Sequence, residues 1–403
     1  MEIGIMNRTS RSILRTSATT FSRANATSLA ALVLLGISLS TQVALAGKPL
    51  PPPPPPPPAV YYDVNELGFG SANSMNEVGI IVGNDNGHAF RYDLLSGGVN
   101  LNNLAATWID LAVSPSQTAT GWIANRADGI NNSGVIVGRA KHVSGATRLY
   151  QFDRSVNQFK LLPGPQSTIP SDGSTSYFGA LINDSGIICS AAGVGMFVYT
   201  PTVEGSYTWE NLWDTFGISI PARQVAINNA GTIVGWYTSG TGSSTIWTAF
   251  RITPAINGYT FPPEQFPGYR FRNVSNGWIC GDRQAVYQGR KVTQAGGAMR
   301  LPDYGTANSI QLLTGGWAAD VNDIGDACIN DGILSMGGGA TLQIDQLIAP
   351  ASKGFWDALP SKHLTAIANR DLTTGFGYIS CYSADFSTTT PVYRCILLTP
   401  RKP

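Results

Sequence analysis

Side chains with catalytic chemistry are few in this chain of 403 residues. It contains only three histidines: His88, His142 and His363. His88 belongs to a strand-like motif, so we expect a structural role, and the other two each follow a lysine in what we interpret as solvated loops. No nucleophile elbow, P-loop or His-Glu-x-x-His motif is present. The sequence therefore indicates no catalytic residue.

Acidic residues are scattered singly along the chain. Asp184 and Asp323 occur in a recurring turn, but the alternating acids and distal Glu of an EF-hand loop are lacking. We expect these two aspartates to cap their turns, and we predict neither a metal site nor a cofactor. Glu204, Glu210 and Glu264 lie in predicted loops, and a glycosidase or lyase would require such acids to converge on one channel.

Tryptophans between the predicted strands could bind a ligand. Large rings there either fill the space between neighbouring structural units or form stacking platforms for sugars, and we favour packing. The binding residues stay unassigned. The tryptophans concerned are Trp108, Trp122, Trp213, Trp317 and Trp356.

The elements that must position these side chains come from a repeated phrase, of which Ile130–Gly138 (INNSGVIVG) is a clear copy. Successive copies begin 55, 52, 45, 47 and 47 residues apart. Self-similarity at this period is typical of repeat architectures such as β-propellers. The six copies start at Met75, Ile130, Ile182, Ile227, Val274 and Val321.

One copy contains the signals of four strands. Asn131–Gly134 has the composition of a tight hairpin turn, and Val135–Val137 is a short apolar strand bounded by Gly138. Leu149–Phe152 is another strand-like segment and Phe159–Leu162 is the fourth, because the first leads into the turn at Ile130. Four short strands in about 45 residues make one propeller blade.

A degenerate seventh copy starts at Ile367 and ends after its third strand, Cys395–Pro400. The segment Val60–Leu67 precedes the first copy and could supply the missing outer strand, which would close the ring. We therefore predict an all-β fold, a β-propeller of seven four-stranded blades over residues 60–403. A six-bladed propeller with the last copy as a cap, and an open β-solenoid, are the alternatives.

The paired motifs I-N-x-x-G-x-I-V-G and His88-Ala89-Phe90 resemble the HAF family of bacterial extracellular repeats. The resemblance covers most of residues 60–400, although the histidine is absent from the other copies. It implies a secreted or surface repeat protein and implies no reaction.

The N-terminal region has the features of an export signal. Four arginines precede an apolar run, Leu29–Leu39, and Ala44–Ala46 offers a cleavage site. We predict a signal peptide over residues 1–46, in preference to an uncleaved anchor, and a polyproline II linker over residues 47–59. The expected location is extracellular, periplasmic or at the cell surface, with no stable membrane span after cleavage.

The charge of the mature chain limits its possible partners. Removal of residues 1–46 leaves 22 basic and 24 acidic residues and no basic patch, which argues against nucleic acid as a partner.

Cys189, Cys280 and Cys328 replace valine in small apolar strand positions. Whether Cys381 and Cys395, in one predicted hairpin, form a disulfide is left open.

We therefore expect a secreted or surface-associated, non-catalytic propeller that binds a carbohydrate or protein partner at the cell surface through its inter-strand loops. A polysaccharide-active enzyme and a structural envelope protein are the alternatives.

Overall fold

The computed structural model describes residues 60–402, except for 78, 94–107, 111–120, 154–157, 164–176, 193–194, 219–221, 241–244, 257, 288–289, 371–373 and 388. The predicted signal peptide (1–46) and linker (47–59) lie outside the described residues, so both remain predictions.

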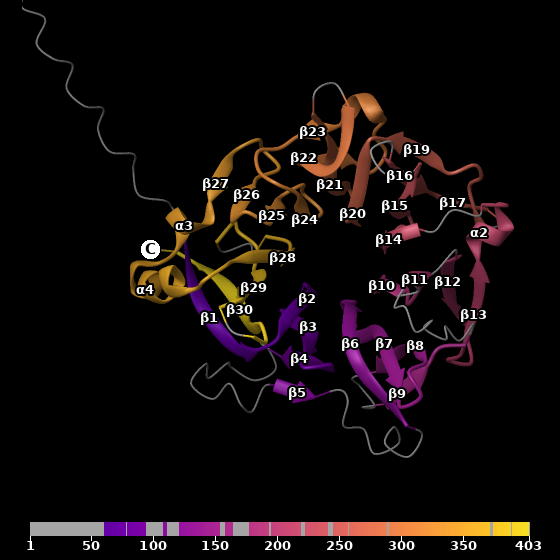
Figure 1. Cartoon of the computed structure of the whole chain (residues 1–403), viewed down its shortest axis with the longest axis horizontal. Helices are drawn as coiled ribbons and strands as arrows, with labels where there is room; N and C mark the ends of the chain where they lie inside the picture. The colour runs from indigo at the N-terminus through magenta and orange to yellow at the C-terminus, as the bar shows by residue number, and fades with distance from the viewer. Residues whose placement is uncertain are drawn as a thin grey trace, which may run out of the picture. The chain divides into compact units, whose positions relative to one another are not determined.

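The described chain forms a ring of seven four-stranded antiparallel sheets, as the repeat predicted (Figure 1). In each blade the first strand borders the central axis and the fourth lies at the rim. Blades one to three are β2 (Ser71–Met75), β3 (Ile80–Asp85), β4 (His88–Asp93) and β5 (Trp108–Asp110); β6 (Trp122–Ile130), β7 (Val135–His142), β8 (Thr147–Asp153) and β9 (Gln158–Leu161); β10 (Tyr177–Ile182), β11 (Ile188–Ala192), β12 (Gly195–Pro201) and β13 (Tyr207–Asn211).

The remaining blades follow the same order. They are β14 (Ala222–Ile227), β15 (Ile233–Ser239), β16 (Ile246–Ile252) and β19 (Glu264–Pro267); β20 (Tyr269–Val274), β21 (Trp278–Tyr287), β22 (Arg290–Pro302) and β23 (Gln311–Leu312); β24 (Ala318–Val321), β25 (Ala327–Ile329), β26 (Ile333–Ser335) and β27 (Thr341–Gln343); β28 (His363–Ile367), β29 (Ile379–Asp385), β30 (Val392–Arg401) and β1 (Tyr61–Phe69). A small hairpin, β17 (Pro254–Ala255) and β18 (Gly258–Tyr259), and the short helices α2 (Leu212–Thr215), η3 (Ala307–Ser309), α3 (Ile344–Leu347) and α4 (Pro350–Ala358) lie outside the blades.

The N-terminal strand closes the ring. β1 pairs antiparallel with β30, from Tyr61 opposite Arg401 to Phe69 opposite Arg394, which confirms the predicted outer strand. The segment from α3 to α4 lies along the free edge of β1, where the Ala349 amide donates to the carbonyl oxygen of Tyr62 at 2.8 Å. Because β1 covers the outer edge of β30, the C-terminal strand has a partner on both sides.

A β-bulge in the first strand explains the glycine that ends the repeated phrase. In blade two the register shifts between Ala127 and Gly129, which pushes the first strand against Gly138. A Cβ at Gly138 would lie 2.0 Å from the carbonyl oxygen of Arg126. Gly83 and Gly281 face equally close carbonyls, at 2.0 and 1.9 Å. Glycine is required at these three positions because a Cβ would overlap the carbonyl oxygen of the first strand.

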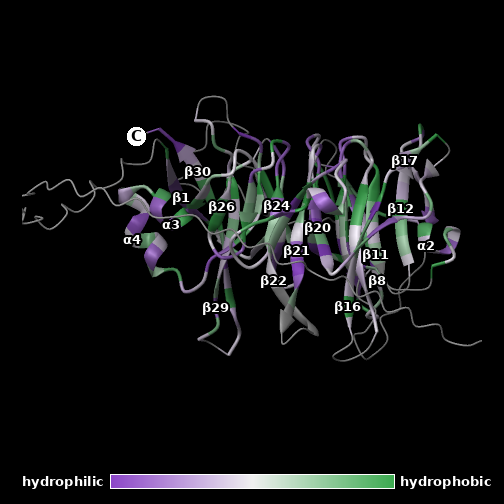
Figure 2. Cartoon of the chain, turned by 90° about the horizontal axis from the view of Figure 1, so that it is seen from above, coloured by the Kyte–Doolittle hydropathy of each residue, from purple (hydrophilic) through white to green (hydrophobic). Residues whose placement is uncertain are grey.

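The hydrophobic core lies between the facing sides of neighbouring blades, and Figure 2 shows hydrophobic residues concentrated along the strands. Trp213 and Trp356 are fully buried, as expected of packing tryptophans. All five cysteines are buried free thiols. Cys381 packs towards blade six and Cys395 towards blade one, so the two point to opposite faces of their sheet and form no disulfide. Among the described residues, no helix has the length and apolar character needed to cross a membrane.

Candidate functional site

The ring surrounds an axial channel with two unlike ends. All first strands run in the same direction along the axis, so the repeated Asn-x-x-Gly turns gather at one end, which we call the turn face. The connections between blades lie at the other end, which we call the junction face. The turn-face end is a polar space of about 180 Å³, and the junction-face end is wider, at about 520 Å³. Residues such as Ser74 and Asp320 line both, so the two spaces adjoin.

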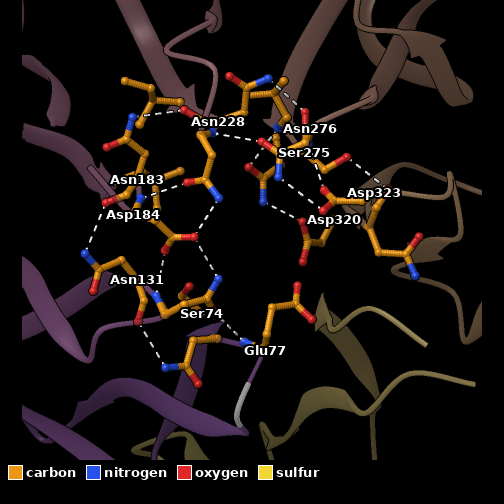
Figure 3. Close-up of a pocket in the computed structure, with 18 of the residues that line it drawn as sticks. Ser74, Glu77, Asn131, Asn183, Asp184, Asn228, Ser275, Asn276, Asp320 and Asp323 are labelled. Atoms are coloured by element: carbon orange, nitrogen blue, oxygen red, sulfur yellow. Dashed lines mark hydrogen bonds between the residues drawn. The ribbon is translucent and has the colours of Figure 1, made fainter. Parts of the chain in front are cut away.

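At the turn face, the first turn residue of most blades donates from its side chain to the backbone of the next blade (Figure 3). Its own Oδ1 accepts from an amide of its own turn, as when Asn131 Oδ1 accepts from the Val135 amide at 2.9 Å. Among the described turns, six links of this kind exist, and only Ala368 lacks a donor. They are Asn76 to Asn131 (3.0 Å), Asn131 to Asn183 (3.1 Å), Asn183 to Asn228 (3.1 Å), Asn228 to Ser275 (2.9 Å), Ser275 to Asn322 (2.9 Å) and Asn322 to Ala368 (3.3 Å).

The second turn residues of the seven blades form a closed ring of seven hydrogen bonds. The backbone amide of each donates to the side-chain oxygen of the equivalent residue in the next blade. The links are Glu77 to Asn132 (3.0 Å), Asn132 to Asp184 (2.8 Å), Asp184 to Asn229 (2.7 Å), Asn229 to Asn276 (3.0 Å), Asn276 to Asp323 (2.8 Å), Asp323 to Asn369 (2.9 Å) and Asn369 to Glu77 (2.7 Å).

These links correct the expectation that Asp184 and Asp323 cap their own turns. Asp184 accepts from the Asn132 amide, and its other oxygen accepts from Asn229 Nδ2 at 2.6 Å. The repeated phrase therefore does more than turn the chain, because it also joins neighbouring blades. Within the described part of the chain, no group of three or more His, Cys, Asp or Glu side chains is placed to hold a metal ion.

Two carboxyl groups that line the turn-face end of the channel have raised pKa values. Burial, reinforced by the charges of Asp323, Asp320 and Asp184, raises the pKa of Glu77 to about 7 despite the Asn369 hydrogen bond. Burial also raises the pKa of Asp320 to about 6, against hydrogen bonds from the Ile367 and Val321 amides and Asn273.

Glu77→Gln should remove part of the pH dependence of stability. The folded protein binds more protons at Glu77 than the unfolded chain between pH 4.5 and about 7, so the free energy of unfolding falls as pH rises through that window. Neighbouring turns partly desolvate the Glu77 carboxyl, but much of the residue's surface remains in solvent, so we expect the free energy of unfolding to change by only about 1 kcal/mol over this window. The side-chain oxygen of the introduced glutamine would still accept from the Asn369 amide. In urea unfolding, the free energy of unfolding of the variant relative to that of wild type should be higher at pH 8 than at pH 5. The same difference at both pH values would contradict this prediction.

The wide end of the channel carries two clusters in which one aspartate binds two arginines. In blade two, Asp128 accepts from Arg126 Nε at 2.6 Å and from Arg139 Nε at 3.2 Å. In blade five, fully buried Asp282 accepts from Arg270 Nη2 at 2.5 Å and from Arg272 Nε at 2.8 Å.

The β-bulges direct several side chains into this end of the channel. Bulge residues Asn73, Asp128, Arg272, Ala319 and Thr365 all line the cavity. A bulge re-aims a side chain that the regular pleat would point elsewhere. Blades two and five are separated by two blades on one side of the ring and three on the other, so their arginine clusters face each other across the axis.

Aromatic side chains accompany the arginines. The Arg272 guanidinium lies 4.2 Å from the centre of the Trp317 ring. A row of rings crosses blade seven from the β29–β30 hairpin to the first strand: Phe386 to Tyr393 at 6.4 Å, Tyr393 to Tyr382 at 5.9 Å, and Tyr382 to His363 at 4.9 Å between centroids. We call these four residues the aromatic row. Tyr382 and Tyr393 line the channel.

A second cavity of about 540 Å³ continues from the channel between blades seven and one. It shares Asn84 and Tyr393 with the channel, and Phe69, 61% exposed, forms part of its wall. Burial raises the pKa of the Tyr382 hydroxyl, the charge of Tyr393 adds to this effect, and the charge of Arg126 acts in the opposite direction. Arg126, Tyr382 and Tyr393 all line the wide end of the channel.

Two histidine predictions were wrong. His142 ends strand β7 and its ring lies 5.0 Å from the ring of Trp122, while His363 lies in β28 against Tyr382. Both are half-buried strand residues rather than solvated loop residues, because aromatic neighbours cover them. His88 starts strand β4, as its motif predicted, and is exposed.

The predicted acids do not converge on the channel. Glu204 lies in an exposed turn, Glu210 in the outer strand β13, and Glu264 in the outer strand β19, where it pairs with Arg251. Of the remaining tryptophans, Trp122 and Trp317 are partly buried, and each contacts an arginine. The sequence did not predict these arginine contacts. The side chain of Trp108 lies outside the described part of the structure.

No family model and no curated protein matches this chain. Solved structures that are similar include a streptogramin B lyase (TM-score 0.42, 10% identity, covering 84% of this chain and 98% of that one). Others are the virginiamycin B lyase of Staphylococcus aureus (0.38, 9%, 84% and 100%) and a luciferin-regenerating enzyme (0.34, 8%, 84% and 95%). No activity or site residue of these proteins is assigned to this chain.

Proposed function

We propose that this chain is an exported, non-catalytic β-propeller that binds carbohydrate at the junction-face end of its axial channel. One observation carries the proposal: two rings of the aromatic row, Tyr382 and Tyr393, line the channel, and Tyr393 also lines the cavity beside Phe69. Export rests on the predicted signal peptide and on the resemblance to HAF repeats.

The rings of the aromatic row suit sugar binding. The C–H groups of a sugar ring pack against aromatic faces, and tyrosine adds a hydroxyl that can hydrogen-bond a sugar hydroxyl. Phe386 is 66% exposed and Tyr393 37% exposed, so the outer rings are accessible, while contacts between successive rings hold the inner ones in place. A row of this kind, with an adjoining cavity, fits an extended oligosaccharide better than a compact ligand.

The carboxylates at this end of the channel favour binding over catalysis. Asp128 is engaged by two arginines, and Asp320 accepts from Asn273 Nδ2 and the amides of Val321 and Ile367. A two-carboxylate glycosidase needs one acid free to donate a proton and a second free to act on the sugar. Both channel aspartates are committed to structural contacts instead.

Tyr393→Ala should weaken oligosaccharide binding at least tenfold, because it removes the ring that belongs to both the channel and the adjoining cavity. Glycan-array screening of the mature protein, followed by calorimetry on the best ligand, would measure this. Tyr304→Ala is the matched control, since Tyr304 is 88% exposed and follows the third strand of blade five at the turn face. A blank array, or equal binding by Tyr393→Ala and wild type, would exclude the proposed function.

A further inference from the structure

The guanidinium of Arg126 is fixed in orientation, and part of it is left available. Its Nε donates to Asp128, whose side chain is only 5% exposed and is also held by Arg139. The Arg126 side chain is 40% exposed and lines the channel. Its Nη1 and Nη2 groups make no hydrogen bond to any residue that the structure describes, so two parallel donors remain for a ligand.

Arg272 has the same arrangement on the opposite wall. Its Nε donates to the buried Asp282, and its guanidinium rests on Trp317. Among the described residues, its Nη groups also have no hydrogen-bond partner, and the side chain lines the same cavity. Arg126 and Arg272 therefore both face the channel, from blades two and five, and Arg272 does so as an arginine–tryptophan pair.

The charge of this end of the channel is unbalanced. Each cluster contains two guanidinium groups and one carboxylate, which leaves one positive charge in each. Asp320 is the other acid of the cavity, and it lies at the border with the turn-face end. A hydroxyl of a neutral sugar can accept a single hydrogen bond from a guanidinium group, whereas a planar carboxylate accepts two parallel hydrogen bonds from one arginine and also balances its charge.

We infer that the carbohydrate is a carboxylate-bearing oligosaccharide, an oligouronide, whose carboxylate accepts from Nη1 and Nη2 of Arg126 while its ring packs against Tyr382 and Tyr393. The next sugar unit occupies the cavity beside Phe69, and Arg272 binds a second carboxylate. This inference rests on the proposed carbohydrate-binding function.

Oligouronides and their methyl esters provide a matched test, because esterification removes the charge and leaves the sugar ring. Calorimetry on the mature protein should show hexamers of galacturonate, guluronate or glucuronate binding at least tenfold more tightly than their methyl esters. Arg126→Gln should lose at least tenfold in affinity for the acid and leave ester binding unchanged. Arg126→Lys should recover only part of the loss, since it restores charge without the paired donors.

Arg401→Gln is the control, because Arg401 is a half-exposed arginine that pairs with Asp63 at the end of β1, outside the channel cavities. Arg272→Gln provides a second channel variant should Arg126→Gln unfold. Equal binding of acid and ester, unchanged binding by both arginine variants, or binding of sulfated but not carboxylated oligosaccharides would overturn the inference. In these cases binding of sugars persists, whereas failure of every oligosaccharide, charged or neutral, would remove the proposed function as well.

Discussion

Gly138→Ala should destabilise the propeller by about 3 kcal/mol, although it adds one methyl group. The new Cβ would lie 2.0 Å from the carbonyl oxygen of Arg126 and 2.9 Å from the Cα of Ala127. Both are backbone atoms of the bulged first strand, which is held by hydrogen bonds to β7 and by packing of its alanines against blade one. The clash can be relieved only by separating two paired strands, which places its cost at the upper end of overpacking effects.

Gly354→Ala is the control for this prediction. Gly354 lies in helix α4, and a Cβ there would meet nothing within 4 Å. Alanine is a better helix former than glycine by about 1 kcal/mol, so this variant should be as stable as wild type or more stable. Urea unfolding followed by circular dichroism would measure both. A Gly138→Ala midpoint equal to that of wild type would show that the bulge does not press on this position.

The blades were predictable because their signals are local and recur. The turn composition, the short apolar run and the glycine after it appear in sequence order, and each blade except the seventh forms from one continuous stretch of about 45 residues. Even ring closure was predictable, since the last copy lacked a strand that Val60–Leu67 could supply, and β1 occupies that position. The Val-to-Cys positions likewise indicated buried strand sites, where Cys189 and Cys328 lie.

The contacts between blades were not predictable from one copy read alone. Asn183 caps its own turn, which sequence reasoning could anticipate, but it also bonds Asn228 of the next blade, 45 residues away. One available signal was the asparagine itself. A hairpin turn accepts several residue types at that position, so its recurrence indicated a second requirement.

The wide end of the channel was missed for a related reason. Its lining comes from bulged residues such as Asp128 and Arg272, and a bulge shifts which side chains face the axis. The assumption that side chains alternate strictly along each first strand therefore predicts the wrong channel-lining residues. Arg270 and Arg272 meet Asp282 only because adjacent strands β20 and β21 place them side by side.

Asp282→Asn should cost about 3–5 kcal/mol of stability, the range for breaking a buried ion pair from one side. The carboxylate is fully buried and accepts three hydrogen bonds, from Nε and Nη2 of Arg270 and Nε of Arg272. An asparagine would retain one acceptor oxygen and turn an NH₂ group towards guanidinium donors. Arg270 is packed 3.6 Å from the centre of the Trp247 ring, and burial lowers its pKa, so its charge would stay poorly solvated once the carboxylate is removed.

Asp357→Asn removes the same charge from an exposed pair with Lys353 in helix α4, and it should change stability by less than about 0.5 kcal/mol. Urea is the suitable denaturant for both variants, because guanidinium salts would screen the charges. A loss below about 1 kcal/mol for Asp282→Asn would mean that water reaches the arginines. The same carboxylate fixes the Nε of Arg272 and so leaves its Nη groups facing the channel. For this reason, Asp282→Asn should also weaken oligouronide binding under conditions where the variant remains folded, whereas Asp357→Asn should not.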